Sequence, residues 1–89
     1  MKKSSKLSGK FETNNSTNDS LYLINDQYNT FDHVIDCLVA ICDHGELQAE
    51  QCALITHYKG SCEIATGETN DLIPLQEDLI LYGLNVEIQ

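Results

Sequence analysis

The sequence predicts a two-layer α+β domain in which three helices cover a three-stranded antiparallel sheet. Short apolar runs alternate with longer segments whose apolar residues recur every three to four positions, in the order strand, helix, helix, strand, helix, strand. Segregated helices and strands favour two packed layers. A chain of 89 residues has room for one modest core, so the short strands need helices over one face of the sheet.

The N-terminal segment differs in composition from the rest of the chain. Residues 1–19 are rich in Ser, Asn, Thr and Lys, and Phe11 is their only aromatic residue. Such a segment buries too little apolar surface to offset the entropy of ordering, so we expect a disordered tail before a folded domain at residues 20–89. No apolar stretch follows Lys2 and Lys3 as in a secretory signal, and none is long enough to span a membrane. The expected compartment is the cytoplasm.

The first strand and the first helix are the clearest elements. Residues 21–24 form a short apolar run between polar residues, which predicts a strand. Asn29 or Thr30 offers an N-cap for the helix that follows. Its apolar residues have the spacing of an amphipathic helix and are Phe31, Val34, Ile35, Leu38, Val39 and Cys42. We expect this helix to end at His44-Gly45, with Gly45 as a left-handed C-cap.

The second helix is predicted from about Glu46 to Tyr58 and ends at Gly60. Its larger apolar residues share one side of the helix, which we expect to be its buried face. They are Leu47, Leu54, Ile55 and Tyr58, with Gln51 or Cys52 between them.

The last third of the chain predicts a strand at 62–66, a turn at 67–70 and a third helix. We expect Asp71 as the N-cap of that helix, which puts Pro74 in its first turn, where a missing N–H costs little. Its apolar stripe is expected to consist of Leu75, Leu79 and Tyr82, and Gly83 ends it. Residues 84–89 alternate apolar and polar, which is typical of a half-buried strand.

Charge divides sharply along the chain. Four of the five lysines lie in the first ten residues, and there is no arginine. From Ser20 onward the sequence has twelve acidic side chains and one lysine, Lys59, which gives a net charge of −11. Such a surface repels phosphate backbones, so we expect no nucleic acid as a partner. It attracts cationic ligands.

The cysteines and acidic residues suggest neither a metal site nor an enzyme. Cys37, Cys42, Cys52 and Cys62 have no zinc-like spacing, so we expect reduced, buried thiols and no cofactor. His33 lies one helical turn before Cys37, but a zinc site needs two further ligands. The chain has no nucleophile–base pairing, no Gly-rich phosphate loop and no paired carboxylates. An acid–base pair of Asp26 and His57 is the one enzymatic alternative.

Two runs carry the functional signal: Asn25-Asp26-Gln27-Tyr28-Asn29-Thr30-Phe31, followed by Val34, and His57-Tyr58-Lys59-Gly60. Together they suggest a strand edge that presents an amide, a carboxylate and an imidazole to one small cation. The free amino terminus of another polypeptide fits, because it is mostly an ammonium near neutral pH. A structural alternative also exists, since Asn25 and Asp26 are ordinary turn residues, His57 suits a helix C-terminus, and Phe31 and Val34 suit a core.

The order of elements and the two runs resemble the bacterial ClpS family, the Clp protease adaptors that recognise N-degrons. The resemblance implies that Asn25, Asp26 and His57 bind the α-amino group of the degron. The positions that would line the pocket for its first side chain are Asn29, Phe31, Val34, Ala53 and Thr56. It also implies delivery to the N-terminal domain of a Clp AAA+ unfoldase, with no catalytic residue, and a flexible N-terminal extension that takes part in delivery.

The chain departs from the family pattern at three positions of the first run. Gln27 stands where a second Asp is usual, Thr30 replaces Pro, and Phe31 replaces Met. The segment from Cys62 to Gly83 is shorter than is common in the family, so no unfoldase-docking residue is carried onto it. The alternative hypothesis is a protein-interaction domain of the same fold that binds no N-degron.

Overall fold

The computed structural model describes residues 18–89. Its elements are β1 (Asp19–Ile24), α1 (Phe31–Cys42), α2 (Glu46–Lys59), β2 (Ser61–Gly67), α3 (Thr69–Leu81) and β3 (Val86–Ile88). This confirms the predicted element order and the α+β class. The predicted tail lies outside the described residues at positions 1–17, and its last residue, Asp19, is the first of β1. Within residues 18–89, no helix has both the length and the apolarity needed to cross a bilayer.

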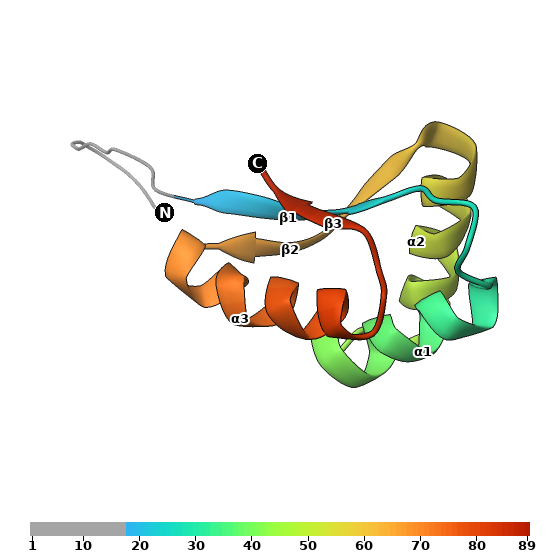
Figure 1. Cartoon of the computed structure of the whole chain (residues 1–89), viewed down its shortest axis with the longest axis horizontal. Helices are drawn as coiled ribbons and strands as arrows, with labels where there is room; N and C mark the ends of the chain where they lie inside the picture. Colours follow the sequence, from blue (N-terminus) through green and yellow to red (C-terminus); the bar gives the residue numbers. More distant parts are fainter. Residues whose placement is uncertain (1–17) are drawn as a thin grey trace.

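The sheet has β1 at its centre, with the order β2-β1-β3 and both pairings antiparallel. The three helices lie on one side of it (Figure 1). The alternation along β1 turns Leu21 and Leu23 inward, and both are almost fully buried. The register against β2 shifts between Leu21 and Tyr22, so that β2 carries one extra residue at Ile64.

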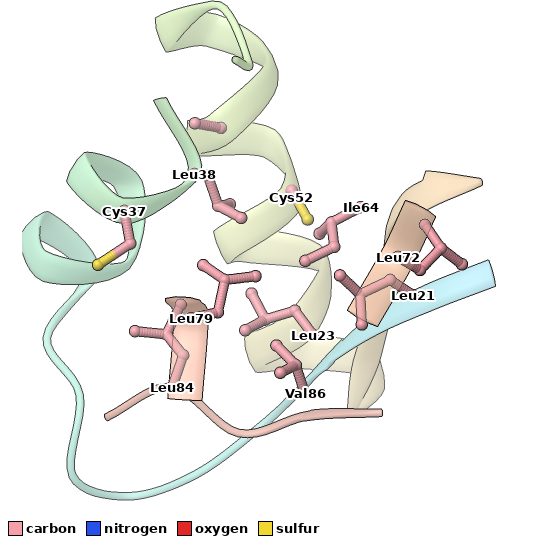
Figure 2. Close-up of a cluster of buried hydrophobic side chains, with 11 residues drawn as sticks. Leu21, Leu23, Cys37, Leu38, Cys52, Ile64, Leu72, Leu79, Leu84 and Val86 are labelled. Carbon is pink, nitrogen blue, oxygen red and sulfur yellow. The ribbon is translucent and has the colours of Figure 1, made fainter. Parts of the chain in front are cut away.

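The core lies between the sheet and the helices (Figure 2). Four leucines are its largest fully buried side chains, and they come from β1, α1 and α3: Leu21, Leu38, Leu72 and Leu79. Full burial of one leucine stabilises the folded state by about 1.5–3 kcal/mol. In α3 the buried stripe is Leu72 and Leu79, whereas Tyr82, expected to belong to it, is exposed.

The predicted buried face of α2 is wrong. Its four members are the exposed ones, at 67% for Leu47, 48% for Leu54, 42% for Ile55 and 78% for Tyr58. The face that packs on β2 and α1 consists of smaller residues: Ala49, Cys52, Ala53 and Thr56. Small side chains let the helix backbone come close to its neighbours, so the bulkier stripe is turned to solvent.

Two helix boundaries also differ from the prediction. The left-handed residue after α1 is Asp43, with φ of 59°, while Gly45 has φ of −68° and is the N-cap of α2. The α1–α2 loop has only three residues, so the chain must reverse directly after α1, and Asp tolerates this conformation. Glu68, not Asp71, is the N-cap of α3, which makes Pro74 the sixth residue of that helix.

The last strand is shorter than predicted but keeps its alternation. β3 contains residues 86–88, with Val86 buried and Glu87 exposed. Ser20 and Gln89 exchange two backbone hydrogen bonds of 2.9 and 2.8 Å, which extends the pairing beyond the strand.

Candidate functional site

A cavity of about 520 Å³ opens beside the end of β1, the start of α1 and the C-terminal half of α2. All eight predicted site residues line it: Asn25, Asp26, Asn29, Phe31, Val34, Ala53, Thr56 and His57. The sequence analysis missed four further lining residues, which are Leu23, Ile24, Gln27 and Thr30. Leu23 and Ile24 belong to the predicted first strand, and Thr30 was a predicted N-cap. Their closeness in sequence to Asn25, Asp26 and Phe31 could have indicated that they line the same cavity.

A backbone hydrogen bond brings the two sequence runs together. The N–H of Asn25 donates to the carbonyl oxygen of Gly60 over 2.9 Å. Gly60 ends α2 with φ of 98°, a left-handed conformation that glycine adopts without steric cost, and the chain then enters β2. Because β2 pairs with β1 from Ser61 onward, the end of α2 is held beside the end of β1. This joins Asn25 and His57 around one cavity.

Asp26 builds the loop that follows β1. Its Oδ1 accepts hydrogen bonds from the backbone N–H groups of Tyr28 and Asn29, at 2.8 and 2.9 Å. Its Oδ2 accepts from Nδ2 of Asn29 at 2.8 Å. Burial by itself would raise the pKa of Asp26, but the hydrogen bonds from Asn29 and Tyr28 stabilise the charged form and hold that pKa below its ordinary value. The Asx-turn that these residue types suggested therefore exists, and it places a carboxylate in the cavity wall.

Two side chains tie this loop and α1 to the turn after α3. Nδ2 of Asn29 also donates to the carbonyl oxygen of Gly83, at 3.0 Å. Nε2 of His33 lies 2.8 Å from the carbonyl oxygen of Tyr82. A carbonyl only accepts, so Nε2 carries the proton in this contact. The sequence offered no signal for these two contacts, since the partners lie about fifty residues away.

The start of α1 and the end of α2 meet through aromatic rings. Oγ1 of Thr30 accepts from the N–H of His33 at 3.1 Å, which makes Thr30 the N-cap and fixes where α1 begins. The rings of Phe31 and His57 then lie 5.5 Å apart in an edge-on arrangement. Phe31 is 44% exposed and His57 is exposed, so both rings are accessible from solvent at the cavity.

Two of the three residues that α2 contributes to the cavity wall are buried. Ala53 and Thr56 are 3% and 5% exposed. Oγ1 of Thr56 donates to the carbonyl oxygen of Cys52 at 2.8 Å, so its hydroxyl is satisfied within the helix and needs no ligand. With Val34 on the facing helix, this part of the cavity suits an apolar group. The site thus combines an apolar lining with an amide, a carboxylate and an imidazole.

The comparisons with known proteins identify a family and a fold. The family model described as ATP-dependent Clp protease adaptor protein ClpS matches residues 15–86. The chain belongs to the ClpS family. Membership of an adaptor family fits the prediction that the chain is not an enzyme.

The solved structures include a ClpS protein with the same fold. It is Agrobacterium tumefaciens ClpS2 bound to L-phenylalaninamide, with a TM-score of 0.66 and 17% sequence identity, and the match covers 82% of this chain and 98% of that one. A search of the curated proteins found no significant match.

Proposed function

We propose that this ClpS-family protein is a bacterial cytoplasmic adaptor that binds N-degrons, the destabilising N-terminal residues of substrate proteins, and delivers the substrates to a Clp AAA+ unfoldase. One observation carries the proposal: Asn25, Asp26 and His57 line the same cavity as the apolar Val34 and Ala53. Acceptors for a cation therefore lie beside space for an apolar side chain. The first residue of a polypeptide has both features, because its charged α-amino group is attached to the same carbon as a side chain that can be apolar.

The polar residues match the chemistry of an α-amino group. This group is mostly an ammonium near pH 7, with three N–H donors and a positive charge. Asp26 supplies a carboxylate, Asn25 a carbonyl oxygen, and His57 a ring nitrogen. Hydrogen bonds of this charged type contribute about 1.5–3 kcal/mol each. An internal peptide bond has one N–H and no charge, so the same residues discriminate against it.

The cavity volume suits a large apolar first side chain. About 520 Å³ is ample for leucine or an aromatic residue. Burial of such a side chain contributes about 1.5–3 kcal/mol. The A. tumefaciens relative was solved with L-phenylalaninamide, an aromatic amino acid amide, and this supports the proposal. Asn29, Phe31 and Thr56 complete the proposed lining.

Delivery requires a second partner, which we propose to be the N-terminal domain of a Clp unfoldase. The support is membership of a family described as adaptors of the ATP-dependent Clp protease. We also propose that the polar segment at residues 1–19 acts as an extension during delivery.

A structure of this protein in complex with L-phenylalaninamide tests the binding site. The ligand nitrogen should lie within hydrogen-bond distance of Asn25, Asp26 and His57, with its ring in the cavity beside Val34 and Ala53. The matched control is 3-phenylpropanamide, which keeps the ring and the carboxamide but lacks the amino group, and it should not bind. A ring placed elsewhere, or equal binding of the control, would remove the proposal.

A further inference from the structure

The outward face of α2 begins where the cavity ends. Its last two turns contribute Ala53, Thr56 and His57 to the cavity wall. The same two turns carry Leu54, Ile55 and Tyr58, which do not line the cavity and are exposed at 48%, 42% and 78%. Tyr58 is three positions after Ile55 and four after Leu54, so the three side chains share one face of the helix.

A row of three aromatic rings connects the cavity to this face. Phe31 and His57 line the cavity, with ring centroids 5.5 Å apart at an interplanar angle of 64°. His57 and Tyr58 have centroids 4.9 Å apart at 79°. The row therefore leads from a half-exposed ring at the cavity to a ring on the outer surface of α2. It spans at most about 10 Å, which is the reach of about three extended residues.

We propose that Tyr58, with Leu54 and Ile55, forms a second subsite that binds an apolar side chain at the second or third residue of a chain whose first residue occupies the cavity. This inference rests on the proposed function. A chain anchored by its amino group beside His57 must leave the cavity, and the aromatic row is an apolar path of the length that its next residues can cover. An apolar side chain there covers exposed rings and aliphatic groups that otherwise face water.

Because this face of α2 is continuous with the cavity, the bound chain is a better candidate to cover it than a second copy of this protein. Residues 20–89 carry a net charge of −11, so two copies repel each other. A stable dimer also buries about 800 Å² on each partner. Even with Leu47, the outward side of α2 has only four exposed apolar side chains, which are too few for that. The three beside the cavity match the size of one or two residues of a peptide.

The test is a binding titration with peptides that share a free N-terminal Phe. At the second and third positions, Leu or Tyr is compared with Ser. The native protein should bind the apolar versions about three- to tenfold more tightly, the size of one aromatic contact. Tyr58→Ala should abolish this preference, and Tyr58→Phe should retain it. Tyr82→Ala is the matched control, since Tyr82 directly follows α3, is 57% exposed and lies outside the cavity.

The outcomes separate this inference from the proposed function. If free-amino peptides bind and acetylated ones do not, but Tyr58→Ala keeps the native preference or the native protein has none, the second subsite is wrong and the adaptor function stands. If no free-amino peptide binds, both fail. Sedimentation that shows a dimer lost on Tyr58→Ala would assign the face to a second copy and overturn the inference.

Discussion

Asp26 shapes the loop after β1, and in the proposed function it also takes part in recognition. Its carboxylate accepts three hydrogen bonds, from Tyr28 and Asn29, and these shape the loop between β1 and α1. The turn interpretation and the binding interpretation of the Asn25-Asp26 pair are therefore compatible. The same contacts that close the loop also keep the carboxylate ionised, which is the state that a cation requires.

Replacement of Asp26 should weaken both the fold and the binding of free-amino peptides. Asp26→Ala removes three hydrogen bonds at a half-buried position, so we expect a loss of about 1–2 kcal/mol in the free energy of unfolding at pH 7. Peptide affinity should fall about tenfold or more, because one charged partner is lost. Glu77→Ala, at an exposed position of α3, is the control.

The difference in free energy of unfolding between the native protein and Asp26→Ala should become smaller as the pH falls. The pKa of Asp26 is lower in the folded protein than its ordinary value, so its contribution is present above about pH 4 and is lost as the pH falls through the folded-state pKa. Urea unfolding of the native protein and of Asp26→Ala at pH 7 and pH 3 measures this. A difference that stays constant over this range would contradict the role assigned to the carboxylate.

Among the elements, α2 shows where sequence patterns succeed and where they fail. Its start at Glu46 and its end before Gly60 followed from composition and the glycine stop. Its orientation did not follow, because periodicity groups residues on a face without deciding which face packs. The stripe of Ala49, Cys52 and Ala53 is weakly apolar, yet it is the one that fits against β2.

A pair of substitutions on α2 tests this orientation. Ala49→Leu should destabilise the fold by about 1–3 kcal/mol, because Ala49 is fully buried and a larger side chain overpacks the interface. Leu47→Gln should change stability by less than about 0.5 kcal/mol, since Leu47 is 67% exposed. Urea denaturation measures both. The reverse ranking would mean that the larger apolar stripe faces the core.

For the molecule as a whole, the site forms at one end of the central strand. The end of β1 is held from both sides, since the N–H of Ile24 donates to Asn85 at 2.8 Å and that of Asn25 donates to Gly60 at 2.9 Å. The two motif runs, with Asn25, Asp26 and His57, were visible in the sequence, whereas Ala53 and Thr56 were named only through the family resemblance. The contacts of Asn29 with Gly83 and of His33 with Tyr82 were not visible there, because they depend on the packing of α3.

The net charge of −11 over residues 20–89 is also a property of the whole molecule. It draws cationic groups toward the surface, and in the proposed function the arrangement of Asn25, Asp26 and His57 then selects an amino terminus among them. General attraction to cations alone would also hold a lysine side chain. Selective binding of an amino terminus therefore depends on the residues around the amino group and not on the net charge of the surface.

The most direct test is a fluorescence anisotropy titration with two peptides that differ only in acetylation of an N-terminal Phe. The account predicts that the free peptide binds and that its acetylated twin binds about 100-fold more weakly or not at all, since at least two charge-assisted hydrogen bonds are lost. A lysine in the body of both peptides keeps a cation present in each. Equal affinity of the two peptides would contradict the central claim that the cavity recognises the start of a chain.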